Sequence, residues 1–89
     1  MSTYTVVLTS RARRQLRKLS ASVQKQIKPV IDALAENPRP EGVKKLKGMK
    51  KGIARYRVRS GNYRIIYEID DNFLRVDVVD IKDRREAYS

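Results

Sequence analysis

The fold is decided by residues 54–79, ARYRVRSGNYRIIYEIDDNFLRVDVV. Polar and apolar residues alternate with a period of two through three runs of this stretch, which is typical of strands that bury one face. Residues 60–62, Ser-Gly-Asn, and residues 70–72, Asp-Asp-Asn, separate the runs and have the composition of tight turns. The stretch therefore predicts a three-stranded antiparallel meander with one buried face.

A further strand and a first helix are predicted at the start of the chain. Residues 4–8, Tyr-Thr-Val-Val-Leu, are mostly β-branched or aromatic and favour a strand. Thr9 or Ser10 can cap a helix that runs through Lys18, because apolar residues recur there on a single narrow stripe.

A second helix is predicted to begin at Ser20 or Ser22 and to end before the prolines at positions 38 and 40. Pro29 lies inside its apolar pattern, where a proline removes a backbone N–H and costs about 3 kcal/mol. Because the apolar spacing runs straight through Pro29, we expect one kinked helix. The alternative is two short helices with Pro29 in the first turn of the second.

Together these elements define an α+β fold in one small domain, residues 1–89. The expected order is β-α-α-β-β-β, with two N-terminal helices packed on one face of a mostly antiparallel four-stranded sheet. The length of 89 residues and the 40% share of hydrophobic residues suffice for one thin core.

The composition excludes several classes of function. The chain has no cysteine and no histidine, which rules out disulfides, thiolate or histidine catalysis, and Cys- or His-ligated metal sites. We therefore expect no metal and no cofactor. The net charge of +11 favours a polyanionic partner, with nucleic acid the first choice. Without an apolar run of about 18 residues or a signal-peptide pattern, we expect a cytoplasmic protein with no membrane partner.

Positive charge is concentrated in the middle of the chain. Residues 1–38 hold seven basic and two acidic side chains, residues 39–59 hold nine and one, and residues 60–89 hold five and seven. A lysine cluster in the middle segment is predicted to lie in a loop and to contact backbone phosphates without reading bases. It consists of Lys44, Lys45, Lys47, Lys50 and Lys51.

Arginines dominate one face of the predicted hairpin. Arg55, Arg57 and Arg59 share a face by alternation, and Arg64 lies across the turn from the last two. Guanidinium groups repel one another, so their clustering predicts a phosphate site. The alternative is a solvated outer face of a basic domain.

Tyr88 lies in a polar C-terminal segment without apolar periodicity. An aromatic ring beside arginines suits stacking on an exposed base. The alternative is a loosely packed terminus.

Several motifs together resemble the RelE/ParE toxin superfamily and, within it, the RelE branch. The motifs are KLKG at residues 45–48, RSGNYRIIY at residues 59–67 and RREAY at residues 84–88, after the predicted strand and two helices. The likeness covers nearly the whole chain, and the first two motifs are fairly specific in combination. It implies a ribosome-dependent endoribonuclease that cuts mRNA in the decoding site.

The resemblance also implies roles for individual residues. Arg64 matches the arginine that stabilises the scissile phosphate, and Arg84 matches a C-terminal arginine that assists the leaving side. Tyr88 matches the tyrosine that stacks on a base. Arg55 and Arg57 stand where well-studied members carry lysines. Because arginine stays protonated, we expect these two residues to stabilise charge rather than to accept a proton.

The general base remains unassigned at this point. Some members have Gly-His before the tail arginine, whereas this chain has Lys82-Asp83. In the absence of histidine and cysteine, the RNA 2′-hydroxyl is the expected nucleophile, and the protein supplies orientation and positive charge.

The resemblance implies several partners: an acidic RelB-like antitoxin encoded alongside the toxin, the 70S ribosome and mRNA. The toxin–antitoxin complex is expected to bind operator DNA through the antitoxin. Arg59 and the lysine cluster are assigned to RNA and ribosome binding. Two alternatives stay open: a ParE-type toxin that inhibits gyrase, which does not require convergent arginines, and a non-catalytic RNA- or ribosome-binding module.

Overall fold

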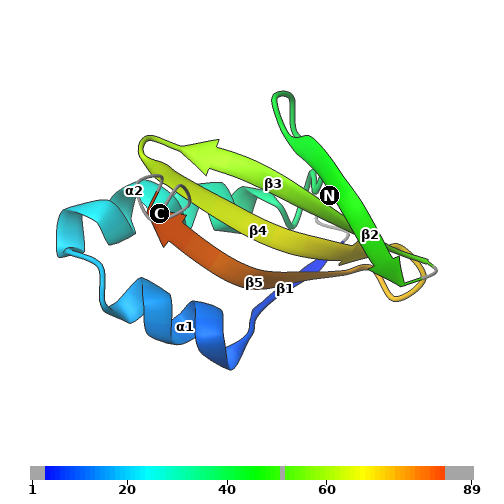
Figure 1. Cartoon of the computed structure of the whole chain (residues 1–89), viewed down its shortest axis with the longest axis horizontal. Helices are drawn as coiled ribbons and strands as arrows, with labels where there is room; N and C mark the ends of the chain where they lie inside the picture. Colours follow the sequence, from blue (N-terminus) through cyan, green and yellow to red (C-terminus); the bar gives the residue numbers. More distant parts are fainter. Residues whose placement is uncertain (1–3, 51, 84–89) are drawn as a thin grey trace.

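The described part of the chain forms two helices and five strands in the computed structural model. The structure describes residues 4–50 and 52–83, and it describes their side chains except those of residues 48–50. The elements are β1 (Thr5–Leu8), α1 (Ser10–Arg17), α2 (Ala21–Ala33), β2 (Lys44–Lys50), β3 (Ile53–Ser60), β4 (Tyr63–Asp70) and β5 (Arg75–Asp83) (Figure 1). No helix within these residues is long and apolar enough to cross a membrane.

All five strands belong to one sheet, in the spatial order β1-β5-β4-β3-β2. β1 runs parallel to β5, and the other neighbouring strands are antiparallel. The predicted α+β class and the meander of β3, β4 and β5 are therefore confirmed. The β3–β4 hairpin turns through Gly61, whose φ of +59° is a left-handed conformation that favours glycine.

The expected count of four strands was wrong, because residues 44–50 form the edge strand β2 rather than a loop. Lys44 pairs with Arg57 of β3 and Leu46 pairs with Arg55, and the register shifts after Leu46. The sequence pattern concealed this strand because a lysine-rich edge strand has little apolar surface to bury. Lysines at an edge also hinder pairing with a further chain.

Both helices begin at caps that the sequence predicts. Thr9 and Ser20 each accept, through the side-chain hydroxyl, a hydrogen bond from the backbone N–H three residues on. α2 continues through Pro29 as one helix, so the alternative of two short helices is wrong. Ile27 and Ile31 on either side of the proline are buried, and their packing offsets the hydrogen bond that the proline removes.

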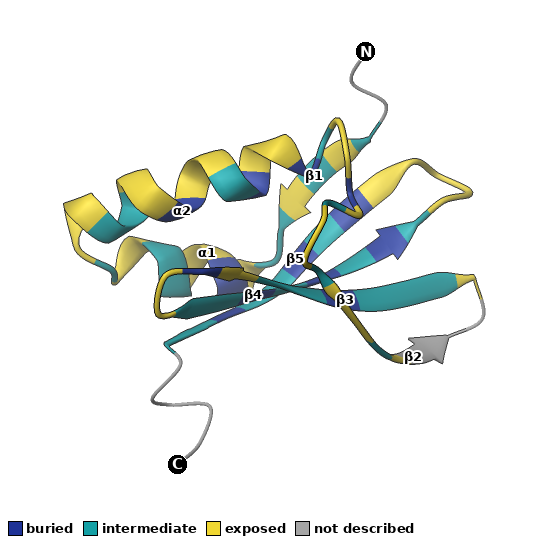
Figure 2. Cartoon of the chain, turned by 90° about the horizontal axis from the view of Figure 1, so that it is seen from above, coloured by how far each residue is buried: buried dark blue, intermediate teal, exposed yellow. Residues whose placement is uncertain are grey.

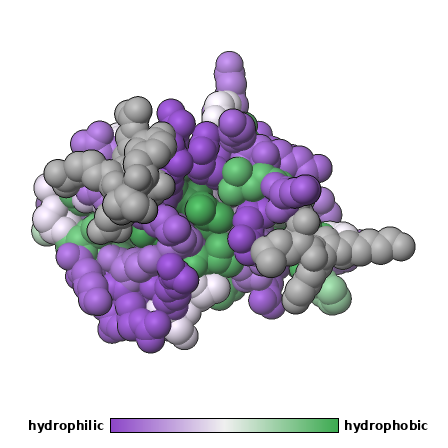
Figure 3. Space-filling view, viewed as in Figure 1, coloured by the Kyte–Doolittle hydropathy of each residue, from purple (hydrophilic) through white to green (hydrophobic). Residues whose placement is uncertain are grey.

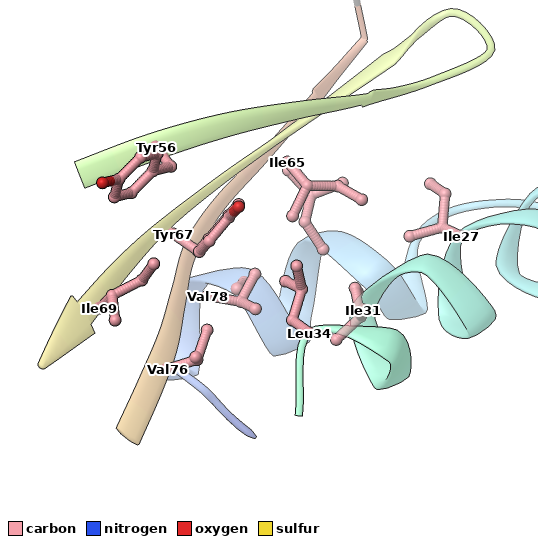
Figure 4. Close-up of a cluster of buried hydrophobic side chains, with 11 residues drawn as sticks. Ile27, Ile31, Leu34, Tyr56, Ile65, Tyr67, Ile69, Val76 and Val78 are labelled. Atoms are coloured by element: carbon pink, nitrogen blue, oxygen red, sulfur yellow. The ribbon is translucent and has the colours of Figure 1, made fainter. Parts of the chain in front are cut away.

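The core lies between the helices and one face of the sheet (Figure 2). Side chains from α2 and from β3, β4 and β5 point toward one another there (Figure 4). The Tyr67 hydroxyl donates to the Pro38 carbonyl oxygen at 2.7 Å, and burial raises the pKa of Tyr67 to about 12. The side chains with no exposure are Ala12, Ile27, Leu34, Ile65, Tyr67, Ile69, Val76 and Val78.

Candidate nucleic-acid interface

The helices leave one face of the sheet uncovered, and we call it the open face (Figure 2). Successive strand residues alternate between the two faces, so the strand register assigns side chains to it. Figure 3 looks onto this face and shows hydrophobic surface in its middle, bordered by hydrophilic residues. Leu46, Ile53 and Ile66 are half-buried there, and Val7 of β1 is 38% exposed.

Positive side chains from four strands meet on the open face near the β3–β4 turn. Arg59 lies directly opposite Arg64, and Arg64 lies directly opposite Lys82 of β5. Arg57 lies opposite Lys44 of β2. We call these five residues the cationic cluster. Like charges directly opposite each other are destabilising, so the arrangement favours a bound polyanion.

The hairpin that carries Arg59 and Arg64 is held against α2. Gln26 Nε2 donates to Ser60 Oγ at 3.3 Å, and a Cβ atom at Gly61 would overlap the Gln26 amide. Arg64 is half-buried, and its Nε atom is fully buried. The helix and the turn thus fix the positions from which both guanidinium groups extend. The prediction that Arg64 shares a face with Arg59 is confirmed.

Arg55 lies on the same face as the cationic cluster and forms an ion pair with a carboxylate. Its Nη2 and Nε atoms lie 2.6 and 3.2 Å from Oε2 of Glu68, the residue directly opposite on β4. The two side chains are 31% and 25% exposed, so the ion pair is only partly solvated. Sequence reasoning misses Glu68 as a site residue, although its place opposite Arg55 follows from the turn at residues 60–62.

Lys82 is positioned by a second carboxylate that sequence reasoning misses. Its Nζ atom lies 3.3 Å from Asp80 Oδ2, and Arg11 Nε lies 3.6 Å from Asp80 Oδ1. Gln15 of α1 donates to Asp80 Oδ1 and accepts from the Ile81 N–H, both at 2.7 Å. These contacts join α1 to the end of β5 that carries Lys82.

The strand β2 divides the predicted lysine cluster between two sides. Lys44 lies on the open face, whereas Lys45 lies opposite Tyr56, whose side chain belongs to the helix-covered face. Lys44, Lys45 and Lys47 are exposed. Only the first of these three is therefore placed with the arginines.

Four other predicted site residues have no described side chain. For Lys50 the structure describes only the backbone, which pairs with Ile53 of β3. Lys51, Arg84 and Tyr88 lie outside the described residues. Within residues 4–50 and 52–83, no group of three or more His, Cys, Asp or Glu side chains could hold a metal ion.

Comparison with known proteins finds relatives along almost the whole chain. The sequence model of the family described as ParE toxin of type II toxin-antitoxin system, parDE, matches residues 6–88. The chain is 33% identical over 88 residues to the mRNA interferase toxin RelE of Escherichia coli (strain K12), covering 97% of this chain and 90% of that protein. It is 33% identical over 86 residues to Toxin RelE of Mycobacterium tuberculosis (strain ATCC 25618 / H37Rv), covering 96% and 86%.

Solved structures share the fold. RelE in the archaeal RelE–RelB complex from Pyrococcus horikoshii OT3 matches with a TM-score of 0.83 and 27% identity, covering 92% of this chain and 96% of that chain. The intact E. coli RelBE toxin–antitoxin complex matches with a TM-score of 0.71 and 31% identity, covering 90% and 95%. These matches confirm the resemblance seen in the sequence motifs. The chain belongs to the ParE/RelE superfamily of type II toxins and, within it, to the RelE branch.

Proposed function

We propose that this chain is the toxin of a type II toxin–antitoxin pair and acts as a ribosome-dependent endoribonuclease that cuts mRNA in the decoding site. The cationic cluster carries the proposal, because side chains from four strands converge on one open face. Relatives from E. coli and Shigella flexneri, which match nearly the whole chain, are named mRNA interferases.

The proposed reaction is an attack of the RNA 2′-hydroxyl on the adjacent phosphate. The 2′-oxygen bonds to phosphorus and the bond to the 5′-oxygen breaks, which leaves a 2′,3′-cyclic phosphate, or a 3′-phosphate after its hydrolysis, and a 5′-hydroxyl. Arg57 and Arg64 stabilise the charge that develops on the phosphorane, and Arg84 assists the leaving oxygen. Arg55 adds positive charge beside them, and Tyr88 stacks on a base. No metal or cofactor takes part.

The ribosome supplies the closure that the open face lacks. Charges on an exposed surface are screened by water and salt, whereas the same charges act more strongly in a site from which water is excluded. The exposed lysines of β2 bind phosphates of ribosomal RNA and add to affinity without reading sequence. The residues proposed for this contact are Lys44, Lys45, Lys47, Lys50, Lys51 and Arg59.

The proposed inhibitor is an acidic RelB-like antitoxin. Relatives have been solved with RelB from P. horikoshii and E. coli, and E. coli RelE has also been solved with an antitoxin peptide. The open face combines half-buried apolar side chains with the cationic cluster, which suits an amphipathic segment that carries acidic residues. The complex binds operator DNA through the antitoxin, and the toxin acts in the cytoplasm.

One experiment separates this function from its alternatives. The protein is incubated with mRNA on programmed ribosomes and, separately, with naked mRNA, and the RNA ends are mapped. We expect cleavage within the decoding site on ribosomes only. Inhibition of gyrase supercoiling with mRNA left intact would instead indicate a ParE-type toxin, in line with the name of the matching family. Ribosome binding without cleavage would indicate a non-catalytic module.

A further inference from the structure

The proposed cleavage needs a group that takes the proton of the 2′-hydroxyl. Arginine side chains stay protonated in proteins, so Arg57 and Arg64 stabilise charge but cannot serve as this base. The base must lie on the open face, within hydrogen-bond reach of a nucleotide bound at the cationic cluster.

The register ranks four described carboxylates of the open face by their distance from Arg57. Glu68 lies on the neighbouring strand, diagonal to Arg57, a relation that separates Cα atoms by about 7–8 Å. Asp77 and Asp80 lie on β5, two strands away, and Asp80 is only 13% exposed. Asp70 lies further along β4 and accepts hydrogen bonds from two backbone N–H groups of the next turn. Glu68 is therefore the best placed of the four.

Arg55 orients the Glu68 carboxylate. Both hydrogen bonds from Arg55 end on Oε2, at 2.6 and 3.2 Å, and neither uses Oε1. A base held through one atom by an orienting group, with another atom outside that contact, is a recurrent arrangement in active sites. With a quarter of its side chain exposed, Glu68 is held in place and can still be reached from solvent.

Glu68 also borders a groove of about 360 Å³ on the open face, lined in addition by Ile53, Asp70, Phe73, Arg75 and Asp77. The charged groups that face Glu68 are Arg55 and Arg57 from β3, Arg75 and Asp77 from β5, and Asp70 from its own strand. Arg75 binds Asp77 at 2.9 and 3.2 Å, which offsets the charge of that carboxylate. The groove holds more carboxylates than arginines, so backbone phosphates are favoured on the side of the cationic cluster. Glu68 lies at the border between the two.

We propose, on the basis of the function proposed above, that Glu68 is the general base of the cleavage. Its carboxylate takes the proton of the 2′-hydroxyl while the 2′-oxygen bonds to phosphorus. The bond from phosphorus to the 5′-oxygen breaks, and this oxygen takes a proton from a water molecule. The resulting hydroxide takes the proton from Glu68, which restores the carboxylate.

The variant Glu68→Gln tests this assignment, because its amide oxygen still accepts from Arg55 while the side chain no longer takes a proton. Single-turnover cleavage on saturating programmed ribosomes is measured across pH, together with ribosome binding. We expect the rate to fall by about 10²–10⁴-fold, the usual contribution of a general base, with ribosome binding unchanged. The wild-type rate should fall at low pH as the carboxylate gains a proton. This fall is the acidic limb of the pH profile, and the variant should lack it.

Asp77→Asn is the matched control, because it removes another arginine-bound carboxylate charge from the same face. It should keep both the rate and the acidic limb. A folded Glu68→Gln protein with the wild-type rate and pH profile overturns the assignment while wild-type cleavage still supports the proposed function. Absence of cleavage by the wild-type protein overturns the proposed function itself.

Thermal unfolding establishes whether the Glu68→Gln variant folds. If the Glu68→Gln variant does not fold, the Glu68→Asp variant tests the assignment instead. Aspartate keeps the carboxylate but is shorter than glutamate by one methylene. This variant should retain the acidic limb and cleave about 10²-fold more slowly, the usual effect of a displacement of about 1 Å. An unchanged rate would overturn the assignment.

Discussion

Arg64 is the member of the cationic cluster with a cation on each side, since it lies between Arg59 and Lys82 in the register. A phosphate bound at this position would therefore meet positive charge from three neighbouring strands, β3, β4 and β5. The half-buried side chain and the short hairpin keep the guanidinium in place before the substrate arrives. Placement of this kind is what makes a charge effective in a transition state.

The variant Arg64→Ala should therefore abolish toxicity and slow cleavage on ribosomes by about 10²-fold or more. Arg64→Lys should recover only part of the rate, because lysine keeps the charge but lacks the planar fork. Single-turnover cleavage measures the effect, with Arg13→Ala on the exposed surface of α1 as the control. Near-normal cleavage by a folded Arg64→Ala protein would remove Arg64 from the site.

The positions of these arginines could be predicted from the sequence because two local rules suffice. A period of two assigns Arg57 and Arg59 to one face, and a short turn at residues 60–62 brings Arg64 opposite them. Asp80 could not be predicted in the same way, because its partner Gln15 lies 65 residues away in the sequence. No local pattern shows which residue of α1 meets the end of β5.

At the scale of elements, β2 extends the open face by one strand and brings lysines to its edge. The sequence did not predict this strand, because its two apolar residues, Leu46 and Met49, are three positions apart and give no period-two alternation. Backbone hydrogen bonds to β3 hold β2 in place. Such pairing depends on the neighbouring strand in the folded sheet, so the sequence of the segment alone does not reveal it. The lysines are therefore fixed along an edge, with Lys44 and Lys45 on opposite sides.

Replacing Lys45 and Lys47, the exposed lysines of β2 outside the cationic cluster, together by alanine should weaken ribosome association and flatten its dependence on salt, because fewer counterions are released from RNA. The single-turnover rate at saturating ribosomes should change much less. Binding titrations at several salt concentrations and a saturated cleavage assay measure the two effects. A large loss of the saturated rate with intact binding would place these lysines in the active site.

A second feature at this scale joins Tyr4, just before β1, to the loop after α2 and to the β4–β5 turn. Asp71 accepts a hydrogen bond from the Tyr4 hydroxyl at 2.6 Å, and Arg39 Nη2 lies 2.8 Å from Asp71 Oδ2. Arg39 also donates to the Tyr56 hydroxyl at 3.0 Å, with its guanidinium over the Tyr56 ring. Hydrogen bonds from Arg39 and then from Tyr4 lower the pKa of Asp71.

The lowered pKa of Asp71 links this contact to acid stability. A carboxylate whose pKa is lower in the folded state stabilises the fold above its unfolded pKa of about 4, and the contribution is lost as the pH falls through the folded pKa. Asp71→Asn should therefore lower the melting temperature at pH 7 and have less effect near pH 3. The difference should be small, because the Asp71 side chain is 54% exposed.

Thermal unfolding at the two pH values measures the difference, with Asp32→Asn on the exposed surface of α2 as the control. An equal effect of Asp71→Asn at both pH values would show that the ion pair contributes nothing that depends on the charge of this carboxylate.

At the scale of the whole molecule, most of the described carboxylates of the open face gather toward one of its ends. The cationic cluster lies near the β3–β4 turn, whereas Glu68, Asp70 and Asp77 border the groove toward the β4–β5 turn. The net charge of +11 attracts polyanions from any direction, and the unequal face directs them to one end. RNA and an acidic antitoxin would therefore compete for the cluster, which explains how one partner could block the other.

This competition determines the kinetics expected for the antitoxin. We expect it to be net acidic and largely unfolded alone, and to fold as it covers the cationic cluster and the half-buried Leu46 and Ile66. Electrostatic steering should make association fast, with a rate constant that falls steeply between about 50 and 500 mM salt. Dissociation should depend only weakly on salt, because buried apolar contacts hold the complex once it has formed.

Stopped-flow measurements give both the association and the dissociation rate. Replacing Arg59 by alanine should reduce the salt dependence of the association rate and leave that of the dissociation rate unchanged. An association rate insensitive to salt, or a neutralising partner that is basic and compact when free, would contradict this account.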